Sequence, residues 1–212
     1  MNRAIWLYWG LIAFAIVGTA GTKFAGVASG PIPEIVSALI ILTGGWVLVR
    51  HCNPGMTILV LALGATAEIV GIYTGYPFGR YAYSDVWQPI VHLPEGKNFP
   101  LLVPFAWFLI AGGCALLTGP IKKGGALYAA ILATVIDAAM EPIIVNHLKY
   151  WKWLDNGPLP GGASILNPIG WFVTALLVAF LLHAKKEKLA SKEAGHILGG
   201  YAALKTAILF LT

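Results

Sequence analysis

The sequence contains few charged residues and almost no cysteine. Only 11% of its 212 residues are Asp, Glu, Lys or Arg, whereas 58% belong to the apolar set and the mean hydropathy is +0.77. Water-soluble domains usually carry about twice this share of charge, so the composition indicates that lipid is the solvent. The two cysteines, Cys52 and Cys114, are too few for a disulfide framework and do not indicate a compartment.

The net charge of +5 does not indicate a nucleic-acid-binding protein, because much of the excess lies in one short cluster. This cluster follows directly after an apolar segment and consists of Lys185, Lys186, Lys188 and Lys192. A basic cluster beside a membrane span favours anionic lipid headgroups and a cytoplasmic loop. We therefore expect membrane lipids, and no nucleic acid, as partners.

Long apolar windows recur along the whole chain. A membrane-spanning helix needs about 20 mostly apolar residues, and seven windows qualify: 4–22, 33–49, 56–73, 99–118, 124–146, 167–184 and 195–212. The first window is longer than the apolar core of a signal peptide, so we expect a retained helix. No repeat, linker or low-complexity tract divides the chain. The sequence predicts one all-α domain over residues 1–212, a polytopic integral membrane helical bundle of about seven transmembrane helices.

Lysine and arginine are distributed unevenly between the two ends of this seven-span topology. The amino-terminal side carries eight, namely Arg3, Arg50, Lys122, Lys123, Lys185, Lys186, Lys188 and Lys192, and the other side carries five, namely Lys23, Arg80, Lys97, Lys149 and Lys152. Because cytoplasmic loops are enriched in basic residues, we expect a multi-pass protein of the cell membrane with a cytoplasmic amino terminus. The two long polar connections, 74–98 and 147–166, then share the opposite side.

Three carboxylates interrupt the apolar windows: Glu68 in the third, and Asp137 and Glu141 in the fifth. An ionisable group at bilayer depth costs about 2.5–3.5 kcal/mol or more, and it indicates a functional site by default. A separation of four residues puts Asp137 and Glu141 on one helix face, where two carboxyls in a low-dielectric pocket are predicted to hold a proton between them. Pro142 predicts a kink that lines a cavity. The structural alternative is that the acids only join helices by hydrogen bonds.

Small and aromatic residues surround the third window. Gly64, Gly71 and Gly75 would let helices approach closely and bring Glu68 toward the Asp137 face. The aromatic residues of the two polar connections are Tyr81, Tyr83, Trp87, Tyr150, Trp151 and Trp153. They form either an interfacial belt or a pocket that stabilises a cation, at about 0.5–2 kcal/mol for each ring.

The order of these motifs resembles the carotenoid biosynthesis protein family, which includes carotenoid 1,2-hydratases and bisanhydrobacterioruberin hydratases. The matching pieces are Glu68-x-x-Gly71-x-x-x-Gly75-x-Pro77-Phe78-Gly79-x-Tyr81-x-Tyr83-x-Asp85, Val103-Pro104-Phe105-Ala106-Trp107, Asp137-x-x-x-Glu141-Pro142, Trp151-x-Trp153 and Asn167-x-x-Gly170-Trp171. The resemblance covers residues 60 to 180. The chain departs from the family at Glu141, where Asp is usual, and in the turn 157–162.

The resemblance implies a cofactor-free enzyme that adds water to the terminal double bond of a linear or monocyclic carotenoid, similar to lycopene or γ-carotene, and gives a tertiary alcohol. It implies Asp137, Glu141 and Glu68 as catalytic residues and no metal. The implied substrate-binding residues are Phe78, Arg80, Tyr81, Tyr83, Asp85, Trp107, Trp151, Trp153, Asn167 and Trp171. Other enzymes of carotenoid synthesis are implied as partners.

Four other functions remain open on the sequence alone. A proton-coupled transporter also places carboxylates at mid-membrane, although no second copy of the Asp137 segment marks a duplicated half. Metal-dependent prenyl transfer would use two of the acids with His147. A retinal-binding protein would use Lys205 as a Schiff base, unless this lysine snorkels to the helix end. A carotenoid-binding scaffold without activity would not need the acids.

Overall fold

The computed structural model describes residues 3–211 except 27, 29, 122 and 185–190. Helices dominate this part of the chain. The long ones are α1 (Arg3–Ala25), α2 (Ile32–Val49), α3 (Pro54–Thr74), α6 (Gly125–Ile143), α7 (Leu166–Ala184) and α8 (Ser191–Leu211). A shorter apolar helix, Val103–Thr118, consists of α4 (Val103–Trp107), a π-helical stretch (Phe108–Gly112) and α5 (Gly113–Thr118).

The predicted multi-pass helical bundle is confirmed. Within the described residues, six helices are long and apolar enough to cross a membrane. Each of the seven predicted windows contains a helix, but the fourth helix begins at Val103 instead of residue 99. It is shorter because Lys97–Pro100 forms strand β3. Lys122, Lys185, Lys186 and Lys188 lie outside the described residues, and the orientation of the bundle stays a prediction.

Local sequence signals explain where the helices that carry the acids begin and end. The Asn53 side chain accepts a 2.8 Å hydrogen bond from the backbone N–H of Gly55, and Pro54 occupies the first position of α3. Gly75, with φ of 77°, ends α3 in the left-handed conformation that glycine favours. Helix α6 ends one residue after Pro142 and continues as the π-helical stretch Ile144–Leu148. The hydrogen-bond pattern of the helix thus changes next to the proline, and the kink itself stays a prediction.

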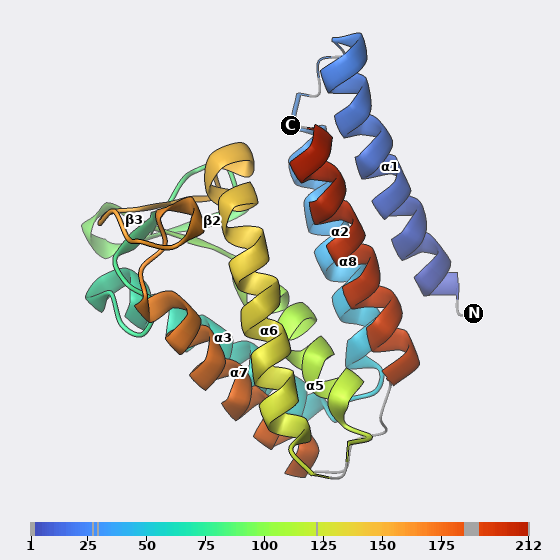
Figure 1. Cartoon of the computed structure of the whole chain (residues 1–212), viewed down its shortest axis with the longest axis vertical. Coiled ribbons are helices and arrows are strands. Elements are labelled where there is room, and N and C mark those ends of the chain that lie inside the picture. The colour runs from blue at the N-terminus through green and yellow to red at the C-terminus, as the bar shows by residue number, and fades with distance from the viewer. Residues whose placement is uncertain (1–2, 27, 29, 122, 185–190, 212) are drawn as a thin grey trace.

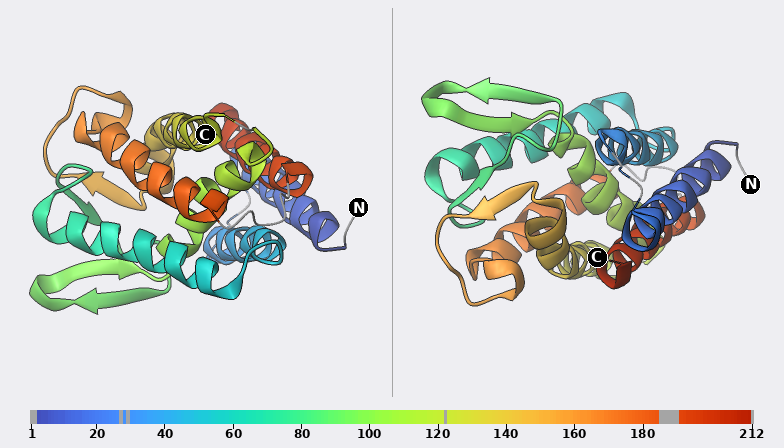
Figure 2. Two further views of the ribbon diagram at one scale, coloured as in Figure 1. Left: turned by 90° about the horizontal axis from the view of Figure 1, so that it is seen from below. Right: turned by 90° about the horizontal axis from the view of Figure 1, so that it is seen from above.

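The helices form two groups that lie side by side (Figure 1). Helix α1 packs against α2 and α8 at one edge of the molecule, and α6 and α7 pack along each other in the second group. The two end-on views in Figure 2 show α1 at the periphery as well. The acids Glu68, Asp137 and Glu141 therefore belong to helices of the second group, away from α1.

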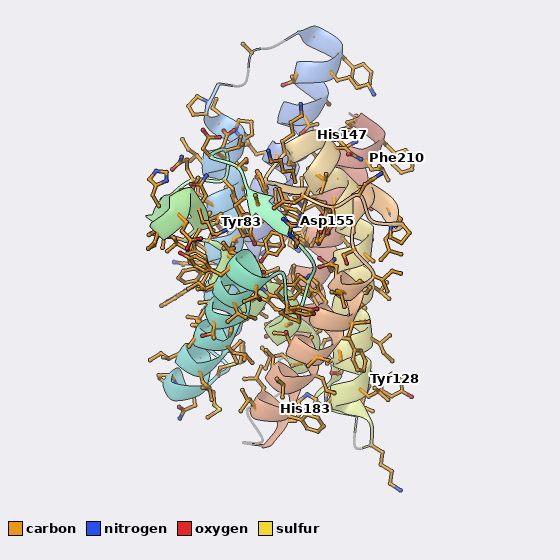
Figure 3. All side chains as sticks on the ribbon, turned by 90° about the vertical axis from the view of Figure 1, so that its left-hand side faces the viewer. Tyr83, Tyr128, His147, Asp155, His183 and Phe210 are labelled. Atoms are coloured by element: carbon orange, nitrogen blue, oxygen red, sulfur yellow. The ribbon has the colours of Figure 1, made fainter. Side chains whose placement is uncertain are left out.

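The two long connections lie at the same end of the bundle, as predicted. Figure 3 shows Tyr83, His147 and Asp155 in the upper half of the view and Tyr128 and His183 near the lower end. These connections contain two small antiparallel sheets that the all-α prediction did not include. Strand β1 (Tyr81–Tyr83) pairs with β4 (Trp151–Trp153), and β2 (Ile90–Leu93) pairs with β3 (Lys97–Pro100). The first of these sheets covers the acids.

Candidate active site

The β1–β4 sheet presents four aromatic side chains on one face. Its register pairs Tyr81 with Trp153 and Tyr83 with Trp151. Because side chains alternate between the two faces of a strand, these four share one face. The ring centroids of Tyr81 and Trp153 are 5.7 Å apart, and those of Tyr83 and Trp151 are 5.9 Å apart. All four side chains donate hydrogen bonds to carboxylates on α3 and α6.

Glu68 of α3 is held by three donors and is only 6% exposed. The hydroxyls of Tyr81 and Tyr83 donate to its Oε2 at 2.5 and 2.8 Å, and the indole N–H of Trp107 donates to Oε1 at 2.8 Å. Burial, and then the nearby Glu68 charge, raise the pKa of both tyrosines well above their ordinary value of 10.0. Both hydroxyls therefore stay protonated and keep donating at neutral pH.

Glu141 of α6 is held by two donors on the same oxygen. The indole N–H groups of Trp151 and Trp153 donate to Oε1 at 2.9 and 2.5 Å. Within the described residues, no side chain or backbone group donates to its Oε2. The 154–165 loop closes over this residue at Gly161, where φ is 76° and a Cβ would lie 3.2 Å from the carbonyl carbon of Glu141. The loop therefore shields Glu141, which is 2% exposed.

Asp137 lies one turn earlier on α6 and is 1% exposed. The side-chain amide of Asn167, at the start of α7, donates to its Oδ2 at 2.7 Å. Its Oδ1 has no hydrogen-bond donor in the described part of the chain. Asp137 lies close enough to Glu141 and Glu68 to interact with both charges, and Glu141 also interacts with Glu68. The structure thus brings the three predicted acids into one buried cluster.

A pocket runs between the two helix groups and reaches this cluster. Residues from α2, α3, α4, α6, α7, α8 and the connections line it: Ser37, Ile41, Glu68, Tyr83, Trp87, Val103, Ala106, Trp107, Ile110, Met140, Ile144, Tyr150, Trp151, Trp171, Tyr201 and Lys205. Glu68 lies on its wall, whereas Asp137 and Glu141 do not. Met140 of α6, one turn beyond Asp137, lines the pocket with its flexible side chain.

Stacked aromatic rings form the wall of the pocket next to Glu68. The rings of Trp107 and Trp171 are stacked with centroids 3.9 Å apart, and Phe78 lies 5.8 Å from Trp107. Glycines make this packing possible, because a Cβ at Gly64 would lie 2.8 Å from Trp107 and one at Gly170 would lie 2.6 Å from Phe78. The glycines of α3 therefore serve the contact with Trp107 and the rings around it.

Arg80 and Asp85 are the two implied substrate-binding residues that the structure does not bring to the cluster. Asp85 is exposed. Arg80 forms a 3.3 Å ion pair with Asp155, in which the two side chains are 67% and 60% exposed. A role for either residue in binding substrate stays a prediction.

Several pocket residues were not expected from the sequence. Ser37 and Tyr201 lie in apolar helices without any signal that marks them. An interfacial belt is wrong for Tyr81, Tyr83, Trp87 and Tyr150, each of which is 9% exposed or less. Lys205 does not snorkel, because it is 8% exposed and lines the pocket. Lys205 lies four residues after Tyr201 on α8, so the two share one helix face. This spacing was the sequence signal that could have predicted a position for Lys205 facing the protein.

The chain was compared with protein families, curated proteins and solved structures. No curated protein and no solved structure matches the chain. The described residues contain no group of three or more His, Cys, Asp and Glu side chains placed to hold a metal ion. The family model described as carotenoid biosynthesis protein matches residues 29–211, a range that begins after α1 and includes every residue of the acid cluster. The chain therefore belongs to the carotenoid biosynthesis protein family.

Proposed function

We propose that this protein is a cofactor-independent carotenoid hydratase. It adds water to the terminal carbon–carbon double bond of a linear or monocyclic carotenoid, similar to lycopene or γ-carotene, and produces a tertiary alcohol. Membership of the family supports a role in carotenoid biosynthesis. The observation that carries the finer proposal is the cluster of three buried carboxyls under the aromatic face of the β1–β4 sheet, next to a pocket between membrane-spanning helices.

The proposed reaction is an acid-catalysed hydration. A carboxylic acid transfers its proton to the less substituted alkene carbon, the π electrons form the new C–H bond, and the other carbon becomes a tertiary cation. Water then forms a C–O bond with this cation and loses a proton to the carboxylate that formed in the first step. The sum is alkene plus water giving alcohol, and the acid is regenerated. General acid catalysis contributes roughly 10²–10⁴-fold to such a rate.

The hydrogen-bond pattern supports different roles for the three acids. Among the residues that the structure describes, Asp137 and Glu141 each have one carboxyl oxygen that accepts a hydrogen bond and one that does not. A protonated carboxyl has the same division, because one oxygen accepts and the other carries the proton that it can donate. We assign the proton transfer to this pair. For Asp137, the substrate end would pass the flexible side chain of Met140.

Glu68 suits a different role because both of its oxygens already accept hydrogen bonds. Three fixed donors hold its charge in place on the pocket wall. A preoriented negative charge stabilises a cation that forms beside it and orients the attacking water. We therefore assign Glu68 to the water and the cation, and not to the first proton transfer.

The indole rings complete the proposed cation site. Trp107, Trp151 and Trp171 line the pocket with Glu68. The face of an aromatic ring attracts a cation by about 0.5–2 kcal/mol, and the larger values apply where water is excluded. The bundle and the covering connections exclude bulk water, which strengthens this attraction and limits side reactions of the cation.

Expression of the chain in cells that accumulate lycopene tests this function. Mass spectrometry of the extracted pigments should show products heavier by one or two molecules of water. Glu68→Gln should lose the product, whereas Glu95→Gln, a change to an exposed acid outside the implied site, should keep it. Unchanged lycopene in cells that contain the membrane-inserted wild-type protein would refute the proposal.

A polyene-binding protein without activity is the second candidate, because the same aromatic pocket would serve binding alone. It differs in its need for the acids. If Glu68→Gln, Asp137→Asn and Glu141→Gln retain bound pigment at the wild-type level and the wild type forms no alcohol, the binding function replaces the hydratase.

A further inference from the structure

The pocket has a second polar region, at the end where α2, α8 and the connection before β2 meet. Ser37, Trp87, Tyr150 and Lys205 line this region. The rings of Trp87 and Tyr150 are stacked at 4.9 Å with an interplanar angle of 5°, and the Tyr150 hydroxyl donates to Ser37 Oγ at 3.2 Å. These contacts join Ser37, Trp87 and Tyr150, and Lys205 lines the same pocket. Neither the proposed proton transfer nor the cation site uses them.

Lys205 is a buried amine without a carboxylate partner. It is 8% exposed, and no Asp or Glu oxygen among the described residues lies within 4 Å of its Nζ. Its only specific contact found there is with the ring of Tyr201, whose centroid lies 5.1 Å away. An amine at this depth is costly unless its N–H groups find acceptors. The amine donates hydrogen bonds whether or not it is protonated.

Trp87 supplies a second donor without an acceptor. Its side chain is 6% exposed, and its Nε1 is one of the buried polar atoms that have no hydrogen-bond partner in the described structure. Buried polar atoms are nearly always paired, so an unpaired one in a pocket wall indicates a ligand that completes it. Trp87 therefore gives an observation that is independent of Lys205, from a different segment of the chain.

We propose that this region is an oxygen-recognition subsite, in which the Lys205 amine and the Trp87 N–H donate hydrogen bonds to a hydroxyl or keto oxygen on the end group of the polyene. The subsite rests on the proposed function, because it defines the substrate class of the same pocket. A hydrocarbon end group would leave both donors unpaired. The enzyme should therefore prefer a polyene that already carries an oxygen near the end that it hydrates.

The subsite adjoins the acid cluster through Tyr83. The ring centroids of Trp87 and Tyr83 are 6.2 Å apart, and the Tyr83 hydroxyl donates to Glu68. A site built to hydrogen-bond a substrate oxygen rejects the analogue that lacks it, because its own polar groups are then buried without partners. The Lys205 and Trp87 donors would therefore discriminate against an end group without oxygen.

Binding of two polyenes to the full chain in lipid nanodiscs tests the subsite without requiring turnover. The probes are lycopene and lycopene with a keto oxygen at carbon 4, and quenching of tryptophan fluorescence reports binding. The wild type should bind the keto polyene with a Kd at least tenfold lower. Lys205→Met and Trp87→Phe should each bring the ratio of the two Kd values close to 1, mainly by weakening keto binding.

Matched variants control for the changes themselves. Lys192→Met alters an exposed lysine on the same helix, and Trp46→Phe alters a tryptophan that is 61% exposed. Both should keep the wild-type ratio. If Lys205→Met does not insert into nanodiscs, Trp87→Phe decides the outcome.

Equal wild-type affinity for the two probes would overturn the subsite and would indicate that a lipid ester oxygen or water occupies the donors. The two proposals fail separately. A hydrated product from lycopene with equal affinities leaves the hydratase and removes the subsite. A keto preference that Lys205→Met abolishes, without any alcohol formed, leaves the subsite and removes the hydratase.

Discussion

The side-chain amide of Asn167 donates a 2.7 Å hydrogen bond to Oδ2 of Asp137, and both side chains are buried where α7 packs on α6. An amide N–H can only donate, so it fixes Oδ2 as the accepting oxygen of the acid. The contact orients the carboxyl and leaves Oδ1 available for a proton. Glu141 has the same arrangement, because its Oε1 accepts from Trp151 and Trp153 and its Oε2 is left available for a proton.

Replacement of Asp137 by Asn should abolish hydration while the protein stays in the membrane. Asn keeps the size and the acceptor oxygen of the side chain but has no acidic proton, so the alcohol should fall by about 10²-fold or more. Pigment mass spectrometry, with immunodetection of the membrane fraction, measures both quantities. Wild-type alcohol from this variant would remove Asp137 from the proton transfer and leave Glu141.

Removal of one tyrosine hydroxyl from Glu68 should slow the reaction without loss of the fold. A hydrogen bond to a charged group contributes about 1.5–3 kcal/mol, so Tyr81→Phe and Tyr83→Phe should each lower kcat by roughly 10- to 100-fold. Because the pKa of both tyrosines is raised, their hydroxyls stay protonated as the pH rises, and the difference from wild type should be constant between pH 7 and 10.

The control for the tyrosine series is Tyr76→Phe, which changes a side chain that is 66% exposed. Its kcat should stay within about twofold of wild type. If all three variants lose activity equally, the loss reflects general damage to the connection, and the hydrogen bonds to Glu68 have no special role.

The sequence predicted the helical bundle and the importance of the three acids, but it did not predict the β1–β4 sheet that covers them. Hydropathy identifies the spans because lipid permits few other structures, and rarity marks Glu68, Asp137 and Glu141 as functional candidates. The alternation of Tyr81 with Tyr83 and of Trp151 with Trp153 has the period of a strand. The pairing of these two segments, about 70 residues apart in the chain, depends on the whole bundle and has no local signal.

Lys205 shows the opposite kind of error. A lysine near the end of an apolar helix usually extends to the interface, and the sequence alone supports that outcome. In the structure, Lys205 instead lines the pocket together with residues of α2 and α6. Tyr201 lies one turn earlier on the same face of α8 and contacts the Lys205 amine through its ring. Which side of a nearly uniform apolar helix faces the protein depends on its neighbours, and this information is absent from the composition of α8.

Loss of the Arg80 side chain should leave both activity and stability almost unchanged. Its ion pair with Asp155 is largely exposed, and exposed pairs contribute about 0–1 kcal/mol. Arg80→Ala should therefore form alcohol at a rate within about twofold of wild type and unfold within a few degrees of it in a detergent thermal-shift assay. A tenfold loss of alcohol with unchanged stability would instead support the substrate-binding role that the family resemblance implies.

A methyl group added at Gly64 of α3 should displace Trp107 and so disturb the proposed cation site. In Gly64→Ala, the new Cβ would lie 2.8 Å from both Cβ and Cγ of Trp107, which is 1% exposed and cannot move aside without shifting its stack on Trp171. Overpacking of this kind costs about 1–3 kcal/mol. It should also move the Trp107 N–H away from Glu68, so alcohol formation should fall along with the unfolding temperature.

Gly10→Ala is the matched control, because a Cβ there has nothing within 4 Å and alanine is the better helix former. A Gly64→Ala protein as stable and active as wild type would show that α3 and α4 separate easily, and that the position of Trp107 against Glu68 is not needed for the reaction.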